Sequence, residues 1–276
     1  MFGAAGRPGT LDGAPAHRLV RGPGLPARLA RGAGGARNGA PDAEKNALHP
    51  QRVKQWVIPA EGSPAFAAAM EHVLDAYAAP YDARFPLVCV DERPCALVGE
   101  ARDPLPLQPG RVLRQDAEYV RGGLCCLLLA FEPLRGWRQA WVRPQRRRLE
   151  FAELVAHLAE EVYPTAARIR LVCDQLNTHS AAAFYARYPP ERARRLAERV
   201  EFIYTPVHGS WLNVVETEFS ILVRQCLGHR RLGGIDQLDQ QVQAWVAARN
   251  QRKATIQWHL TTADARRRLT KLYPSI

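Results

Sequence analysis

Lysine is scarce in this 276-residue chain, and the patterns of secreted, membrane and zinc-binding proteins are missing. The longest apolar run, residues 124–131, is far too short to cross a bilayer. No apolar segment of a secretory signal follows the N-terminus. No two cysteines are spaced as CxxC, which excludes the common zinc and redox motifs. We therefore expect a cytoplasmic protein with no membrane span.

The charge of the chain is strongly positive, and arginine carries nearly all of it. Only four of the 38 basic residues are lysine, and 27 acidic residues leave a net charge of +11. A GC-rich genome explains arginine in place of lysine, but it does not explain the excess over acids. Such an excess favours a polyanionic partner, usually a nucleic acid. Candidates for backbone contacts are Arg146, Arg147, Arg148, Arg224, Arg230 and Arg231, although a solvated basic face is the commoner role of any one arginine.

The hydrophobic pattern after residue 62 predicts strands and helices in a recognisable order. Helices are expected over residues 63–80, 150–164, 180–200 with a break at Pro189-Pro190, 210–227, 235–251 and 262–273. Strands are expected over residues 85–93, 122–133, 136–144 and 200–206, and residues 168–179 are expected to form a buried strand that ends in an Asp and a polar loop. Three successive strands, followed by strands that alternate with helices, predict an α/β fold in which helices cover both faces of a mixed sheet. The ribonuclease-H-like fold has this element order.

Two of the expected buried strands end in aspartate. Asp91 follows the apolar run PLVCV, and Asp174 follows RLVC. Strand ends are where ligands gather in open sheets of this kind. Asp91 and its neighbour Glu92 point to opposite faces of their strand, so only one of them can join a given site. The alternation favours Asp91 for that site.

The helix expected to begin at Ser210 carries two glutamates, and only one of them can face a given site. Glu218 lies about 200° around a helix from Glu216. Asn213 and Glu216 are three residues apart and would share one face. We expect Ser210 to cap the helix N-terminus and Gly209 to permit the sharp entry of the chain.

Asp91, Asp174 and Glu216 together would form a carboxylate triad. Shared carboxylates can hold two Mg²⁺ ions about 3.5–4 Å apart, where the ions bind the attacking and leaving oxygens of a phosphodiester. Three acids without a cation repel one another, so a purely structural triad is unfavourable. Singly, a strand-end aspartate is more often a turn residue, and a helical glutamate is more often solvated. Their combination in a basic protein indicates metal-dependent phosphodiester chemistry.

Three segments of the chain resemble a known family of enzymes. VDER (90–93), CDQLNTH (173–179) and TPVHGSWLNVVETEFSIL (205–222) are similar to the catalytic core of bacterial insertion-sequence transposases of the mariner superfamily, the insertion sequence six-thirty group. The resemblance runs from about residue 46 to residue 273. It implies a DDE superfamily endonuclease with a ribonuclease-H-like fold. By the family pattern the catalytic and metal-binding residues are Asp91, Asp174 and Glu216, with Mg²⁺ as the cofactor in a two-metal site and Mn²⁺ as a possible substitute.

The resemblance also implies supporting residues and partners. Five residues would contact DNA or support the acids, namely Asn177, His179, His208, Ser210 and Asn213. The partners would be double-stranded DNA, as element ends and as target, and a second copy of the chain in a synaptic complex. The protein would then work in the bacterial cytoplasm, at the nucleoid.

The chain divides into four expected parts. Residues 1–43 hold ten of the twenty glycines and show no hydrophobic period, so we expect a disordered or mis-translated segment. Residues 44–82 would form a connector and an amphipathic helix, residues 83–255 the ribonuclease-H-like DDE catalytic domain, and residues 256–276 a C-terminal helix. The family usually carries an N-terminal helix-turn-helix region that reads element ends, and residues 1–43 lack a helical pattern. We therefore expect an N-terminally truncated or mis-started copy.

The preferred interpretation is a DDE transposase that cleaves DNA and transfers strands of an insertion sequence. One alternative is a catalytically inactive transposase remnant that binds DNA or inhibits intact copies in mixed dimers. The other is a ribonuclease-H-like nuclease that acts on RNA–DNA hybrids or branched DNA. The intact triad argues against the remnant.

Overall fold

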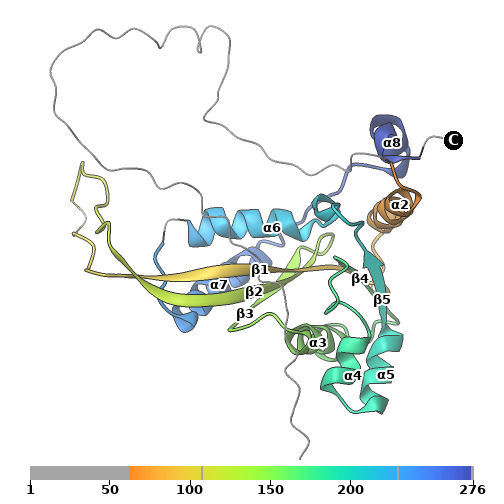
Figure 1. Cartoon of the computed structure of the whole chain (residues 1–276), viewed down its shortest axis with the longest axis horizontal. Helices are drawn as coiled ribbons and strands as arrows, with labels where there is room; N and C mark the ends of the chain where they lie inside the picture. Colours follow the sequence, from red (N-terminus) through yellow and green to blue (C-terminus); the bar gives the residue numbers. More distant parts are fainter. Residues whose placement is uncertain (1–61, 107, 229, 275–276) are drawn as a thin grey trace, which may run out of the picture. The chain divides into compact units, whose positions relative to one another are not determined.

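A computed structural model describes residues 62–106, 108–228 and 230–274 of the protein (Figure 1). The expectations for residues 1–43 and for the connector before residue 62 lie outside these ranges. None of the helices in the described ranges combines the length and the apolar character that crossing a membrane requires.

Five strands form one mixed sheet in the spatial order β3-β2-β1-β4-β5. They are β1 (Leu87–Glu100), β2 (Tyr119–Glu132), β3 (Trp137–Arg143), β4 (Ile169–Cys173) and β5 (Val200–Tyr204). The β1–β2 and β2–β3 pairs are antiparallel, whereas β4 runs parallel to β1 and β5 runs parallel to β4. The predicted mixed sheet is confirmed, and its order and directions are those of a ribonuclease-H-like fold.

The helices follow the predicted pattern closely. They are α2 (Pro64–Ala78), α3 (Arg148–His157), α4 (Ala182–Arg187), α5 (Pro190–Arg199), α6 (Val215–Leu222), α7 (Ile235–Gln251) and α8 (Thr262–Arg268). Single π-helical turns extend α3 to Val162 and α6 to Leu227. Ser63 caps α2 by accepting a hydrogen bond from the amide of Phe66 at 3.4 Å. The chain breaks before Pro190, as the two prolines predict.

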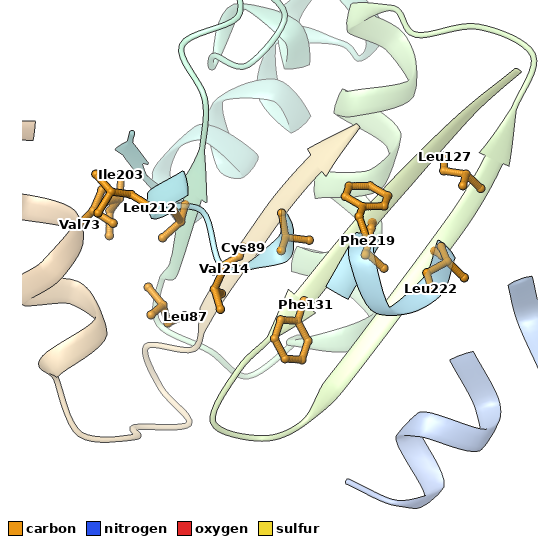
Figure 2. Close-up of a cluster of buried hydrophobic side chains, with 14 of the residues drawn as sticks. Val73, Leu87, Cys89, Leu127, Phe131, Ile203, Leu212, Val214, Phe219 and Leu222 are labelled. Carbon is orange, nitrogen blue, oxygen red and sulfur yellow. The ribbon is translucent and has the colours of Figure 1, made fainter. Parts of the chain in front are cut away.

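Helices cover both faces of the sheet, which confirms the predicted layering. On one face, side chains of α2, α6 and α7 pack with Leu87 and Cys89 of β1 in the core cluster of Figure 2. On the other face, α3, α4 and α5 pack against Val88 and Val90. Because both faces are buried, the strands read as continuous apolar runs rather than as alternating ones.

Strand β1 is longer than the sequence predicts, because it continues past residue 93 to Glu100. Pro94 interrupts the strand pattern and conceals this extension. The pairing of β1 with β4 covers only Leu87 to Cys89, so beyond that point β1 pairs with β2 alone. A proline is tolerated in such a strand where its missing N–H would face away from the partner.

The continuous helix predicted over residues 210–227 is wrong. Ser210–Leu212 form a 3₁₀ turn, Asn213 has an extended backbone with φ −84° and ψ 107°, and α6 begins at Val215. Ser210 therefore does not cap α6, and the prediction that it does is wrong as well. The physical reason is a set of contacts that hold the chain at Asn213, which belong to the site.

Candidate active site

The two predicted aspartates lie level, although only Asp174 follows the end of its strand, because β1 continues past Asp91 to Glu100. β1 and β4 run parallel, and Cys89 of β1 pairs with Val172 of β4. Asp91 and Asp174 each lie two residues beyond that pair. Adjacent strands are about 4.8 Å apart, so this register brings the two predicted aspartates together at one edge of the sheet.

Glu216 lies in the first turn of α6, with its side chain exposed, and it influences Asp91 electrostatically. Burial raises the pKa of Asp91 to about 7, and the negative charges of Glu216 and Asp174 add to that rise. Nowhere in the described ranges do three His, Cys, Asp or Glu side chains lie close enough together to hold a metal ion. Glu216 therefore approaches the aspartates without completing a closed metal-binding group.

Glu218 lies on the opposite side of α6, as the helical spacing predicts. Its side chain is fully buried, whereas that of Glu216 is exposed. The Glu218 carboxylate forms ion pairs with Arg138 Nε at 3.1 Å and with Arg249 Nη2 at 2.6 Å. These contacts join α6 to β3 and α7 and hold the Glu218 carboxylate in the interior, whereas the exposed Glu216 carboxylate acts on the charge of Asp91.

Two buried polar side chains hold the segment that precedes α6. Asn213 Nδ2 donates to the carbonyl of Val90 at 3.0 Å, directly beside Asp91. The Tyr77 hydroxyl donates to the Leu212 carbonyl at 2.9 Å and accepts from the Val214 amide at 3.1 Å. Asn213 thus lies before the helix, and its predicted place on one helical face with Glu216 is wrong. Tyr77 carries no sequence signal beyond its place on the apolar face of α2.

The turn at residues 207–210 borders the site from the side of β5. His208 is exposed and has a φ of 64°, and Ser210 is exposed in the 3₁₀ turn. A Cβ on Gly209 would lie 2.5 Å from Pro206 Cγ, so the glycine is required by a close approach. A cavity of about 330 Å³ opens here, lined by Ser63, Ala65, Phe66, Gln175, Pro206, Val207 and His208.

His179 contacts two carboxylates at once. Its Nδ1 lies 2.6 Å from Asp174 Oδ1, and its Nε2 lies 3.4 Å from Glu92 Oε1. The ring packs on Phe151 with 4.4 Å between the centroids. Glu92 does point away from the face of Asp91, as alternation predicts, but it reaches Asp174 through His179. Alternation places the Glu92 side chain on the opposite face from Asp91, but it cannot show that His179 lies against that face.

The contact between His179 and Asp174 shifts both pKa values. Burial alone would raise the pKa of Asp174, but the hydrogen bond and the charge of His179 lower it below its ordinary value. Burial also disfavours the charged imidazole, yet the hydrogen bonds to Asp174 and Glu92 raise the pKa of His179 to about 9. The contact therefore keeps the Asp174 carboxylate ionised.

The remaining predicted residues differ in how free their side chains are. Asn177 is exposed, and its backbone carbonyl accepts a hydrogen bond from Arg148 at 3.5 Å. Arg146 lies 3.5 Å from Glu92 as an ion pair. Arg231 is mostly buried and pairs with Glu100, the last residue of β1, at 2.8 Å. It therefore stabilises the end of the β1–β2 pair and is less available for contact with DNA.

The acids suit a hard divalent cation. All donors are carboxylate oxygens, which Mg²⁺ and Mn²⁺ prefer. The raised pKa of Asp91 reflects a buried acid beside two others, and a cation would offset that repulsion. Asp91 and Asp174 offer carboxylate oxygens to such an ion, and Glu216 is near enough for its charge to act on Asp91.

Comparison with known proteins places this arrangement in a family. Two solved structures share the fold: the crystal structure of the Mos1 mariner paired end complex with Mn, with a TM-score of 0.50, and that of the Mos1 strand transfer complex, with a TM-score of 0.51. Each is 16% identical and covers 77% of this chain, and the matches cover 68% and 67% of those chains. No curated protein matched the chain. Residues 86–239, more than half of the chain, match the family described as DDE superfamily endonuclease, and the protein therefore belongs to the DDE superfamily endonucleases.

Proposed function

We propose that the protein is a DDE transposase that cleaves DNA at the ends of an insertion sequence and transfers the strands to a target. The observation that carries this proposal is the level placement of Asp91 and Asp174 on parallel strands, with Glu216 close enough to raise the pKa of Asp91. The three motifs of the chain favour the bacterial insertion sequence six-thirty group of the mariner superfamily as its source.

Asp91, Asp174 and Glu216 are proposed as the catalytic and metal-binding residues. Mg²⁺, or Mn²⁺ in its place, would polarise the scissile phosphate and activate the attacking oxygen when bound. Asp91 extends from within β1 and Asp174 from the residue that directly follows β4, and the parallel pairing of these two strands would fix their separation. Glu216 stands on a helix that the buried Glu218 ion pairs and Asn213 hold in place.

The polar side chains around the acids are proposed to contact DNA. Asn177, His208 and Ser210 are exposed on the loops beside the acids. Exposed polar and basic side chains at such positions bind phosphate oxygens and fix the register of the duplex. His179 and Asn213 are buried and would support the acids from within.

The partners are proposed from chemistry and from likeness. The net charge of +11 favours double-stranded DNA, as element ends and as target. The similar Mos1 proteins are described in a paired end complex and a strand transfer complex. By analogy, two copies of this chain would bring two element ends together in a synaptic complex. The reaction would take place in the bacterial cytoplasm, at the nucleoid.

The proposal is tested by cleavage of a supercoiled plasmid that carries the DNA flanking the gene. We expect metal-dependent cuts by the wild-type protein. The cleavage rate should fall by more than about 100-fold in Glu216→Gln and in Asp91→Asn. Glu198→Gln, an exposed change on α5, is the matched control and should cut normally. Normal cutting by Glu216→Gln would show that the assigned site is wrong.

An absence of cutting by folded wild-type protein that binds the plasmid would contradict the catalytic proposal. That result would favour the inactive remnant. Metal-dependent cutting of RNA–DNA hybrids without cutting of the flanking DNA would instead favour a ribonuclease-H-like nuclease.

A further inference from the structure

Glu92 is a buried carboxylate that the proposed reaction does not use directly. Its side chain is only 1% exposed, and its Oε2 accepts no hydrogen bond from the described residues. The partly exposed Arg146 lies 3.5 Å from that oxygen. Burial of an incompletely paired carboxylate is unfavourable. We therefore expect that the contacts of the other Glu92 oxygen serve a function.

The other oxygen of Glu92 leads to the site through a single histidine. Glu92 Oε1 lies 3.4 Å from His179 Nε2, and His179 Nδ1 lies 2.6 Å from Asp174 Oδ1. Phe151 packs against the face of the ring, and the Tyr204 hydroxyl donates to the His179 carbonyl at 2.8 Å. The imidazole is therefore held at both nitrogens, on one face and at its backbone.

This arrangement leaves one oxygen of Asp174 available. Both hydrogen bonds that the described residues make to the Asp174 side chain, from His179 and from the Leu176 amide, end on Oδ1. The side chain is 37% exposed. Because His179 fixes Oδ1, the orientation of Oδ2 is fixed as well. Groups that orient a metal ligand in this way commonly change metal affinity by about 10–100-fold.

We propose that Glu92 is a positioning residue of the DDE site, which holds His179 so that His179 holds Asp174 in the orientation that binds a divalent cation. The inference rests on the proposed function of Asp174. Strand β1 would then serve the site from both faces: Asp91 presents its carboxylate on one side, and Glu92 supports Asp174 from the other.

The test is direct binding of Mn²⁺ to the full chain, measured by titration calorimetry without DNA. We expect Glu92→Gln to weaken Mn²⁺ binding by about 10–100-fold, while cleavage at saturating Mn²⁺ falls much less. Glu92→Asp keeps the charge but shortens the side chain, and it should weaken binding similarly. It carries the test if Glu92→Gln does not fold.

The matched control is Glu132→Gln. Glu132 is also a strand glutamate, 1% exposed and with one unpartnered oxygen among the described residues, but its partners are the Tyr163 hydroxyl at 2.7 Å and Arg135 at 3.5 Å. This variant should bind Mn²⁺ as the wild type does. Equal weakening by Glu132→Gln and Glu92→Gln would mean that any buried charge has this effect, which overturns the inference.

A double-mutant cycle separates positioning through His179 from general loosening. If Glu92 acts through His179, Glu92→Gln should add almost nothing to the loss of Mn²⁺ affinity in His179→Gln. Additive losses would overturn the inference. In the wild type, ¹⁵N-labelled histidine should give a His179 ring signal that shifts in Glu92→Gln and stays unchanged in Glu132→Gln.

The same titration distinguishes failure of this inference from failure of the proposed function. Asp91→Asn and Asp174→Asn should abolish Mn²⁺ binding. If they do and Glu92→Gln binds normally, only the role of Glu92 is wrong. If they bind Mn²⁺ normally, the proposed site itself is wrong.

Discussion

Two glutamates on α6, Glu216 and Glu218, lie two residues apart in opposite environments. The buried one affects stability, and the exposed one is proposed to act in catalysis. Glu218 is fully buried between Arg138 and Arg249, and Arg138 is fully buried as well. Loss of one partner of a buried ion pair leaves an uncompensated charge, which costs far more than the pair itself contributes. Glu216 is exposed, so its charge costs and contributes little to stability.

We predict that Glu218→Gln lowers the free energy of unfolding by about 3–5 kcal/mol, because it leaves Arg138 buried without its counter-ion. The measurement is urea denaturation followed by far-UV circular dichroism. Glu216→Gln is the matched control on the same helix and should change the free energy by less than about 0.5 kcal/mol. Equal destabilisation by the two variants would contradict the assignment of their roles.

Glu132 gives the protein a pH-dependent stability that is independent of the site. Burial raises the pKa of Glu132 above its ordinary value, and the Tyr163 and Arg135 contacts only partly offset this. The folded protein therefore binds this proton more tightly than the unfolded chain does. The contribution of Glu132 to stability is full below its ordinary pKa and is lost as the pH rises through the raised value.

We predict that Glu132→Gln becomes more stable relative to the wild type as the pH rises above the ordinary glutamate pKa of about 4.3. The wild type bears the cost of a buried charge once Glu132 ionises, and the variant does not. Unfolding free energies measured at several pH values test this, with the exposed Glu198→Gln as a control that should show no such trend. If the unfolding free energy of Glu132→Gln instead fell relative to that of the wild type as the pH rises, the predicted direction would be wrong.

At the scale of residues, the sequence identifies those site residues whose positions depend on the local pattern of apolar and polar residues. Asp91 and Asp174 follow apolar strand runs, and the spacing of Glu216 and Glu218 places them on opposite sides of a helix. Glu92 and Tyr77 could not be found in this way. Their roles depend on His179, Leu212 and other residues that only the folded chain brings near them.

The element that presents Glu216 depends on a sharp turn after β5. Gly209 lies so close to Pro206 that a Cβ at this position would meet the proline ring at 2.5 Å. We predict that Gly209→Ala destabilises the protein by about 1–3 kcal/mol and lowers DNA cleavage, because the turn must shift and α6 shifts with it. Thermal unfolding and the plasmid assay measure the two effects.

Gly234→Ala is the control for this prediction. A Cβ on Gly234, just before α7, would have no other atom within 4 Å. The change should alter stability by less than about 1 kcal/mol and leave cleavage intact. Equal effects of the two alanine substitutions would show that the close approach at Gly209 has no special role.

The same element shows why helix boundaries are hard to predict. The apolar pattern of residues 210–227 is continuous, so a single helix is the natural prediction. The helix instead begins at Val215, because Asn213 and Tyr77 bind backbone groups of residues 90, 212 and 214. Such long-range hydrogen bonds override local propensity and leave no trace in the local sequence.

At the scale of the molecule, the order of strands and helices was predictable because turn residues separate the apolar segments that form these elements. The mixed sheet and its covering on both faces follow from that order. The length of the β1–β2 ribbon does not, since Pro94 hides the continuation of β1. The site depends on the parallel pairing of β1 with β4, which belongs to the mixed sheet but which the element order alone did not specify.

We propose that Asp91, Asp174 and Glu216 together bind divalent cations at one site. Fe²⁺ can replace Mg²⁺ at an all-oxygen site, and with ascorbate and peroxide it cuts the polypeptide near its ligands. We predict cuts near residues 91, 174 and 216 that excess Mg²⁺ suppresses and that Asp91→Asn abolishes. Cuts elsewhere, or cuts that persist in Asp91→Asn, would contradict it.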